Sequence, residues 1–384
     1  MAQDVLQQVR ALGPQIDASA AADETATEIA REIIDALIAA GVFGMMAPRE
    51  LGGGECHPAA IIDVVRELSY WDGSTGWYVG ATIVGEAVSG AFLGPQAVAA
   101  MYAEGVPRIA GQAAPGGKAV RVGDHFRVSG SYSFATGCPT ANWIVGGYLV
   151  EGADGTPELD ANGQPVFLLG MVPRETVRFE GNWHVLGLRG TASYDITVGE
   201  QLVHRDFFLT PFTAPQLRGG AFYRMGFMAP PCIAHSAFAL GVARRTLDEW
   251  RAHAQVKDRM PGIKASETHS FQRDFAEAEA ELRAAEAYVR RTFDLLFAAT
   301  EAGEVPDSLR IDGRLAACHA FRTGVSVVQA AFTASATTGL RDGHAIQRCF
   351  RDMQAGNAHF LTGEGALIEA GKALGGVDGA TIVF

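Results

Sequence analysis

The residues best suited to chemistry are an aromatic ring and a hydroxyl group, Phe134 and Thr136, in the segment Gly130–Trp143. Side chains alternate along a β-strand, so in an extended segment these two point to the same face. On that face the ring can pack against a flat heteroaromatic molecule while the hydroxyl hydrogen-bonds its edge. The alternative is an ordinary strand with one core phenylalanine and one surface threonine, and the spacing alone favours that alternative.

A second segment with chemical potential, Leu186–Ile196, lies further along the chain. Gly187 and Gly190 allow its backbone to approach a ligand closely, and Ser193 adds a hydroxyl. Arg189 lies between small residues that cannot cover its guanidinium group. The alternative is a glycine-rich turn that enters the following strand, and the segment alone again favours that alternative.

The elements that must position these segments change character along the chain. Apolar side chains recur at helical spacing over residues 23–40 and 58–71, and the apolar run over 77–93 is typical of a buried helix. Strand signals begin near Pro107 and are separated by turn residues. The predicted strands cover residues 120–128, 142–150, 166–172 and 196–203, which indicates a small antiparallel sheet or barrel.

Helical patterns return after about Pro231 and persist in four long segments of bundle length. They cover residues 233–254, 270–301, 308–338 and 347–374. We therefore expect an α+β protein with three domains. They are an N-terminal helical domain (1–106), a central β domain (107–215) and a C-terminal four-helix bundle (216–384).

The composition excludes several classes of protein. The net charge of −12 disfavours nucleic acid as a partner, because phosphate binding needs a basic surface. The five cysteines are widely spaced and form no CxxC pair, which predicts free thiols, a reducing compartment and no zinc or other metal site. A polar N-terminus without a signal peptide and the absence of a long apolar run predict a cytoplasmic protein that does not associate with membranes.

Four motifs in order resemble the acyl-CoA dehydrogenase superfamily, and in particular its branch of flavin-dependent monooxygenases. They are the turn Asp72–Trp77, the segment Phe134–Trp143, the loop Leu186–Asp195 and the run Gln347–Asp352. The resemblance spans nearly the whole chain, and it implies an acyl-CoA dehydrogenase-like fold with a flavin between the β domain and the bundle. It also implies that Phe134, Thr136 and the adjoining Gly137 line the flavin, together with Gln112, Arg189 and Ser193.

One departure from the dehydrogenases implies a different reaction. Where dehydrogenases place a glutamate eight residues beyond the Arg-Asp pair, this chain has Phe360 beside His359. In the monooxygenase branch, reduced flavin and O₂ give a C4a-(hydro)peroxide, and an imidazole can hold it or deprotonate a phenol-like substrate. The resemblance therefore implies His359 as a catalytic residue, and Arg224 as a cation that stabilises anionic flavin.

The implied enzyme is the oxygenase component of a two-component monooxygenase acting on a small aromatic or polycyclic substrate. Because the sequence has no Gly-x-Gly-x-x-Gly motif for NAD(P)H, reduced FMN (or FAD) would come from a separate flavin reductase. The segment Lys257–Gly262 lacks the dehydrogenase motif for the adenosine end of FAD, which favours FMN. The family generally forms homotetramers through the bundle, so we expect a homotetramer or a dimer.

Two alternatives stay open from the sequence. A desaturase of the acyl-CoA dehydrogenase type would use oxidised FAD and Glu364, which lies four residues beyond the expected position of the base. A flavin-fold binding protein without catalytic activity is suggested because Glu86, Thr140 and Gln354 stand where branch members often have histidine. These departures also advise against copying a phenol hydroxylase assignment.

Overall fold

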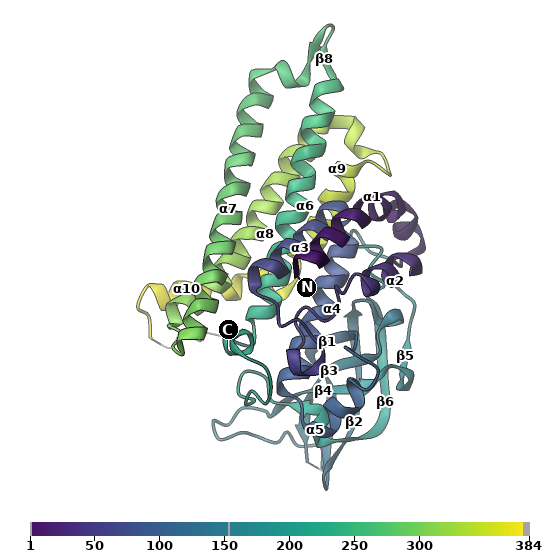
Figure 1. The fold of residues 1–384 in the computed structure, drawn as a ribbon, viewed down its shortest axis with the longest axis vertical. Helices are drawn as coiled ribbons and strands as arrows, with labels where there is room; N and C mark the ends of the chain where they lie inside the picture. Colours follow the sequence, from purple (N-terminus) through teal and green to yellow (C-terminus); the bar gives the residue numbers. More distant parts are fainter. Residues whose placement is uncertain (1, 153, 379–384) are drawn as a thin grey trace.

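The computed structural model describes residues 2–152 and 154–378, which form a block of helices above a curved sheet (Figure 1). Helices come first, strands follow and long helices return, so the predicted order is confirmed. The first group comprises α1 (Ala2–Ala26), α2 (Arg31–Ala39), α3 (Pro58–Trp71), α4 (Gly73–Phe92) and α5 (Pro95–Met101). The last group comprises α6 (Ala229–Val256), α7 (His269–Ala302), α8 (Asp307–Ser335), α9 (Ala345–Asn357) and α10 (Glu364–Leu374).

Within the described residues, seven strands form one mixed sheet in the order β5-β6-β2-β1-β3-β4-β7. They are β1 (Ile109–Val122), β2 (His125–Ala135), β3 (Trp143–Glu151), β4 (Phe167–Pro173), β5 (Val177–Phe179), β6 (Tyr194–His204) and β7 (Phe208–Leu209). Neighbouring strands pair antiparallel, as expected, except β1 and β3, which are parallel with Ile109 opposite Trp143. Ala135 at the end of β2 lies opposite Tyr194 at the start of β6. The start of β1, the end of β2 and the start of β6 therefore meet at one end of the sheet.

Two of the predicted elements are interrupted near the sheet. The single strand over 120–128 is wrong, because the turn of the β1–β2 hairpin falls inside it at Gly123 (φ +59°). The continuous helix over 23–40 is also wrong, because residues 27–30 separate α1 from α2. There the Ala30 N–H donates to the carboxylate of Asp23, which holds the chain in the bend.

The predicted helix over 347–374 is wrong as well, since residues 358–363 separate α9 from α10. The interruption contains a short 3₁₀ turn, η8 (Phe360–Thr362), and His359 is its N-cap residue. Gly363 then precedes the first turn of α10. This break matters for function, because it places His359 outside any helix.

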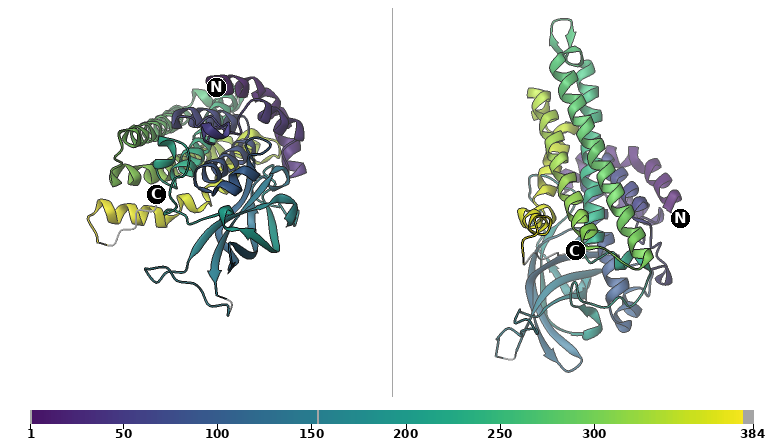
Figure 2. Two further views of the ribbon diagram at one scale, coloured as in Figure 1. Left: turned by 60° about the horizontal axis from the view of Figure 1, so that its bottom comes forward. Right: turned by 90° about the vertical axis from the view of Figure 1, so that its left-hand side faces the viewer.

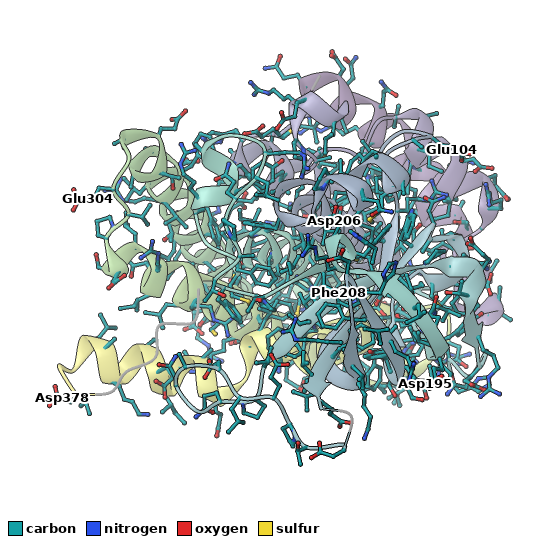
Figure 3. The ribbon with its side chains drawn as sticks, turned by 90° about the horizontal axis from the view of Figure 1, so that it is seen from below. Glu104, Asp195, Asp206, Phe208, Glu304 and Asp378 are labelled. Carbon is teal, nitrogen blue, oxygen red and sulfur yellow. The ribbon has the colours of Figure 1, made fainter. Side chains whose placement is uncertain are left out.

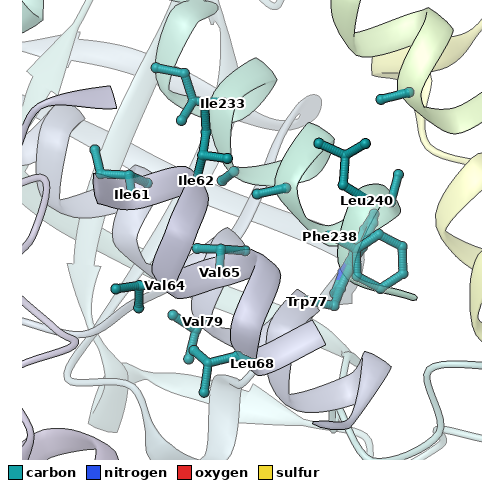
Figure 4. Close-up of a cluster of buried hydrophobic side chains, with 14 of the residues drawn as sticks. Ile61, Ile62, Val64, Val65, Leu68, Trp77, Val79, Ile233, Phe238 and Leu240 are labelled. Carbon is teal, nitrogen blue, oxygen red and sulfur yellow. The ribbon is translucent and has the colours of Figure 1, made fainter. Parts of the chain in front are cut away.

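Both groups of helices contribute to one apolar core. The buried face of α3, with Ile61, Val65 and Leu68, packs against α6, which contributes Ile233 and Leu240 (Figure 4). Burial of each such aliphatic side chain contributes roughly 1.5–3 kcal/mol. This core joins the N-terminal and C-terminal helices. Our proposed boundaries near residues 106 and 215 therefore mark where helices give way to strands and strands to helices along the chain, and they do not separate independent cores.

A second apolar core lies within the sheet, and it is joined to the helices at α5. Phe208 on β7 packs against Phe126, with ring centroids 4.7 Å apart. Asp206, just before it, caps α5 by accepting a hydrogen bond from the Gln96 N–H at 2.9 Å. Seen from below, Asp206 and Phe208 lie near the middle of the molecule, and Asp195 lies toward its edge (Figure 3).

Helices α6 and α7 run side by side as a long hairpin that projects beyond the other helices (Figure 2). Its tip holds the two short strands β8 (Asp258–Met260) and β9 (Ile263–Lys264). No helix in the described part of the chain combines the length and apolarity that crossing a membrane requires.

Candidate functional site

The two glycine-marked segments meet at the end of the sheet where β2 stops and β6 starts. The hydroxyl of Thr136 lies 2.9 Å from that of Ser193, which lies 2.7 Å from the hydroxyl of Thr191. The Gly137 N–H donates to the Thr191 carbonyl at 2.9 Å, and Gly137 adopts φ +73°. The structure therefore brings Thr136, Gly137 and Ser193 together in one hydroxyl-lined wall, although they are far apart in the sequence.

Phe134 stands beside this wall with its ring in the open. Its side chain is 60% exposed, and its backbone adopts the left-handed φ of +65° that phenylalanine rarely accepts. Its ring meets the edge of Trp183, and the Trp183 indole N–H donates to the Leu188 carbonyl at 3.0 Å. Leu188 and Ala192 in the second segment also have positive φ. Such strained backbone persists only where the surroundings fix it, and it concentrates at functional sites.

The loop Leu186–Gly190 is fixed between α4 and α9. Asp352 on α9 accepts a hydrogen bond from the Leu188 N–H at 2.6 Å, and Ser74 on α4 accepts one from the Gly190 N–H at 3.2 Å. A Cβ on Gly187 would lie 2.1 Å from the Arg351 carbonyl oxygen, so only glycine fits there. The loop motif thus contacts each of the other three sequence motifs in the folded chain.

Burial dominates the electrostatics beneath this loop. Burial and, to a smaller extent, the nearby carboxylate of Asp72 raise the pKa of Asp352 to about 7, against the hydrogen bond from the Leu188 N–H, which lowers it. Burial also raises the pKa of Asp72, which Arg348 opposes. Arg351 is paired with Glu24 on α1 at 2.7 Å. The Arg-Asp motif therefore joins helices and loop and lies behind the hydroxyl wall.

His359 belongs to a second cluster, in which three elements meet. Its ring stacks on that of His235 in the second turn of α6, with centroids 4.9 Å apart and planes 18° apart. The ring of Trp77 on α4 meets both imidazoles edge-on, at 4.7 Å and 5.6 Å. Trp77 also meets Phe238 at 5.0 Å, next to it in Figure 4. His235 and Trp183 were missed from the sequence, because both take part only through contacts between distant segments.

Both imidazoles are held in the neutral form. Burial lowers the pKa of His235 to about 4, although its hydrogen bond to the Pro231 carbonyl raises it slightly. Burial, with smaller contributions from the neighbouring His235 and Arg314, lowers the pKa of His359 to about 3. At neutral pH each ring can donate one hydrogen bond and accept one, but neither carries a positive charge.

Helix α4 connects the hydroxyl wall to the imidazole pair. Tyr78 donates to or accepts from the Thr140 hydroxyl at 2.8 Å, and a Cβ on Gly137 would lie 2.3 Å from its ring. The preceding residue, Trp77, contacts both imidazoles. Two adjacent side chains of one helix turn thus touch the two halves of the site.

The other predicted residues lie at different distances from this centre. Gln112 is half-buried on β1, paired with Gly146, at the same end of the sheet. Arg189 is exposed, and its Nε donates to the Val185 carbonyl at 2.9 Å. Arg224 is exposed, and within the described residues no contact joins it to His359 or Phe134. The structure thus gathers the wall residues and leaves both arginines at the surface.

The residues that depart from the branch pattern have structural roles here. Glu86 is buried in α4, and its carboxyl group accepts a hydrogen bond from the Gly44 N–H at 2.9 Å. Burial raises the pKa of Glu86 well above its usual range, which favours the protonated form. Thr140 hydrogen-bonds Tyr78, and Gln354 is half-buried on α9. Glu364 lies exposed in the first turn of α10, in a shallow depression with Arg322.

The side chains of the hydroxyl wall and of the adjacent Phe134 have the chemistry that binding of a flavin requires. An exposed aromatic ring in a fixed backbone can pack against an isoalloxazine ring, and a row of hydroxyl groups can hydrogen-bond its polar edge. Gly137 permits close approach at this point. Phe134, Thr136 and Ser193 are the residues that would hold the ring.

Comparisons with known proteins agree with this arrangement. Residues 3–92 match the family model "Acyl-CoA dehydrogenase, N-terminal domain", and residues 233–364 match "Acyl-CoA dehydrogenase, C-terminal domain". The chain is 31% identical over 377 residues to the flavin-dependent monooxygenase oxygenase subunit HsaA of Mycobacterium tuberculosis, covering 93% of this chain and 91% of HsaA. It is 30% identical over 346 residues to the indole-3-acetate monooxygenase of Pseudomonas putida, covering 89% and 86%.

Solved structures give the same result for the fold. The crystal structure of HsaA from M. tuberculosis superposes with a TM-score of 0.89 and 26% identity, covering 100% of both chains. XiaF from a Streptomyces species, solved with FADH₂ and glycerol, superposes with a TM-score of 0.88 and 19% identity, covering 99% of this chain and 97% of XiaF. The predicted acyl-CoA dehydrogenase-like fold is confirmed.

Proposed function

The chain belongs to the flavin-dependent monooxygenases that share the acyl-CoA dehydrogenase fold, and we propose that it oxygenates a small aromatic or polycyclic substrate. It acts as the oxygenase component of a two-component system. A separate flavin reductase supplies it with reduced FMN or FAD. Reduced flavin, when bound, would supply the two electrons with which one oxygen atom of O₂ is transferred to the substrate and the other becomes water.

The hydroxyl wall binds and orients the ring in this proposal. Phe134 packs against the flavin, which covers the apolar surface that the side chain exposes in the free protein. In the free protein the Thr191 hydroxyl donates to the Leu188 carbonyl, so Ser193 donates to Thr191 and Thr136 donates to Ser193. Thr136 can therefore accept a hydrogen bond from an N–H on the polar edge of the flavin, and Gln112 on β1 adds an amide group at the same end of the sheet. Arg189 and Arg224, both exposed, serve the negative charges of the cofactor, which exposed guanidinium groups can reach by side-chain rotation.

His359 faces the reacting oxygen as a neutral imidazole. Because its pKa lies at about 3 in the free protein, it is suited to hold a proton in a hydrogen bond rather than to carry a positive charge. The Trp77 ring that packs against it, backed by Phe238, limits the access of water, which protects a reactive oxygen species from decay to hydrogen peroxide. An apolar site with a few fixed donors is what oxygen transfer from a flavin needs.

The observation that carries the proposal is the contrast between His359 and Glu364. A dehydrogenase needs a carboxylate that faces the flavin, to remove a proton from its acyl substrate. In the folded chain Glu364 lies exposed on α10, whereas His359 packs in the cluster with Trp77. This contrast favours oxygen chemistry over desaturation.

The test is oxygen incorporation. Reduced FMN or FAD is generated by a flavin reductase under ¹⁸O₂ in the presence of an aromatic panel that includes indole-3-acetate and simple phenols. We expect a product that carries one ¹⁸O atom, detected by mass spectrometry. Products without the label, or hydrogen peroxide alone with every aromatic compound and both flavins, would refute the proposal. Bleaching of bound oxidised FAD by an acyl-CoA would support the desaturase instead.

We also propose a homotetramer assembled through the bundle. The long helices leave apolar side chains in the open, including Leu295 on α7, which is 42% exposed, and Leu340 after α8, which is 63% exposed. Light scattering after size-exclusion chromatography tests this, and a monomer at micromolar concentration would refute it.

A further inference from the structure

The stacked imidazoles of His235 and His359 form a tightly packed pair held by several elements of the fold. His235 is 6% exposed on α6, and His359 caps η8 in the chain that leaves α9. Gly356, one turn earlier, passes so close to the cluster that a Cβ would lie 2.6 Å from Phe238 and 3.1 Å from Trp77. Three separate elements are thus packed together around two parallel rings.

The hydrogen bonds of the rings assign opposite tautomers. The Nδ1 of His235 lies 2.7 Å from the Pro231 carbonyl oxygen, which can only accept, so Nδ1 carries the proton. The Nδ1 of His359 accepts from the Leu361 N–H at 3.4 Å, so its proton is on Nε2. In the neutral pair, His235 therefore has an acceptor at Nε2 and His359 has a donor at Nε2.

Nothing else holds the His359 ring in this tautomer. In many enzymes a carboxylate fixes the orientation of a histidine, but within the described residues no carboxylate hydrogen-bonds either imidazole. The nearest cation that acts on His359 is Arg314 on α8, whose Nη1 lies 3.9 Å from the Sγ of Cys232. The bond to Leu361 is long, so the orientation of the ring also depends on its aromatic neighbours: His235 stacks on it, Trp77 meets it edge-on, and the exposed ring of Phe360 lies 4.7 Å away at a tilt.

We propose that His235 is a positioning residue for His359: by stacking, it holds the His359 ring so that Nε2–H remains the donor to the reacting oxygen. This inference rests on the proposed function, because it assigns His359 its role there. Stacking in an aromatic pair changes the equilibrium constant between the ordered and the disordered orientation of a ring, here that of His359, about two- to tenfold. The Nδ1–H of His235, bonded to Pro231 at 2.7 Å, keeps the His235 ring itself in place.

The first test needs no flavin. Protein with ¹⁵N-labelled histidine is studied by NMR, with the ten histidine signals assigned by single substitutions. We expect His359 as one neutral tautomer protonated at Nε2 in the native protein, and as a mixture of tautomers in His235→Ala. His235→Phe keeps a flat ring, so it should restore the single tautomer. His253→Ala is the matched control, because it removes another α6 imidazole that contacts His344 away from the site.

The second test measures what the positioning does for oxygen chemistry. Reduced FMN-loaded protein is mixed with O₂, and the rate of hydrogen peroxide release is followed. We expect release to be about two- to tenfold faster in His235→Ala, and close to native in His235→Phe and His253→Ala. Reduced FMN should bind all four proteins equally, since neither His235 nor His253 belongs to the hydroxyl wall.

The outcomes separate this inference from the proposed function. If His359 keeps one tautomer in a folded His235→Ala protein, the positioning role is refuted, whatever the enzyme catalyses. If His235→Phe behaves like His235→Ala, stacking is not the cause and the inference also fails. If His235→Ala does not fold, the His359 tautomer is measured in His235→Phe alone. A single tautomer there supports stacking as the cause, and a mixture of tautomers refutes it. A lost tautomer in His235→Ala without any ¹⁸O product from native protein would refute the monooxygenase proposal and leave the positioning of His359 supported.

Discussion

Replacement of Gly137 by alanine tests whether the hydroxyl wall depends on a close approach to α4. Gly137 adopts φ +73°, and a Cβ would lie 2.3 Å and 2.6 Å from two carbons of the Tyr78 ring. The left-handed backbone costs about 1–2 kcal/mol with a side chain present. Crowding in a packed site costs about 1–3 kcal/mol more. We therefore expect Gly137→Ala to lower the free energy of unfolding by about 2–5 kcal/mol.

Gly123→Ala is the matched control for that substitution. Gly123 also has positive φ, at +59°, but no atom lies within 4 Å of its Cβ position. It therefore carries the backbone cost without the clash, and the difference between the two variants isolates the contact with Tyr78 at about 1–3 kcal/mol. Urea unfolding followed by tryptophan fluorescence measures both variants. Reduced FMN should bind more weakly to Gly137→Ala only.

Equal losses of stability in the two variants, within about 0.5 kcal/mol, would refute the close approach. A double-mutant cycle sharpens the test, because Tyr78→Ala removes the ring that the new methyl group meets. The double variant should then lose less than the sum of the two single losses by about 0.5–3 kcal/mol. Strict additivity would show that Gly137 and Tyr78 do not touch.

Three further predictions separate binding from stability. Phe134→Ala should weaken reduced FMN binding about three- to tenfold, seen by fluorescence titration, with almost no change in unfolding because the side chain is 60% exposed. Between pH 4 and about 7, the buried Asp352 holds a proton that the unfolded chain loses, so the stability of the native protein should fall as pH rises through this window. Asp352→Asn keeps an acceptor for the Leu188 N–H and should flatten that part of the pH profile in urea titrations. Glu86→Gln should change stability by less than about 1 kcal/mol, whereas Glu86→Ala, which leaves the Gly44 N–H unpaired, should cost about 2–4 kcal/mol in the same assay.

The contrary outcomes are equally definite. A strongly destabilised Phe134→Ala protein would mean that the ring supports the fold rather than a ligand. An unchanged pH profile in Asp352→Asn would mean that Asp352 is ionised in the folded protein. A severe loss in Glu86→Gln would mean that Glu86 carries a charge on which the contact with Gly44 depends.

Local sequence signals predicted the parts of the fold that depend on neighbours along the chain. The helix over 58–71 is confirmed, because Pro58 suits the first turn and the pattern of buried residues follows the helical period. The five cysteines are free and buried, as their spacing predicted. Besides the strand over 120–128, the helix over 23–40 and the helix over 347–374 were wrong. The two helices failed for a shared reason. In both, the sequence near the break continues to favour helix, and tertiary contacts override it: the Ala30–Asp23 bond in the first and the packing of His359 in the second.

The candidate site was predictable in part for the same reason. Phe134, Thr136 and Ser193 could be found because their types recur in a family motif, and the structure brings the two hydroxyls within 2.9 Å. His235 lies in the middle of an apolar helix, where no pattern of spacing distinguishes it from a core histidine. Only the break after α9, which the sequence did not reveal, brings His359 onto its face.

That arrangement bears on why this fold would do oxygen chemistry here. A buried histidine beside a carboxylate tends to become charged, because the anion stabilises the imidazolium ion. In this cluster the neighbours of His359 include the rings of Trp77, His235 and Phe360, and burial together with His235 and the cation Arg314 favours the neutral imidazole. A neutral donor in an apolar surrounding can stabilise an oxygen atom without giving up its proton to water. The same surrounding makes His359 a poor base for removing a proton from an acyl substrate, because burial disfavours the charged imidazolium that this step would form.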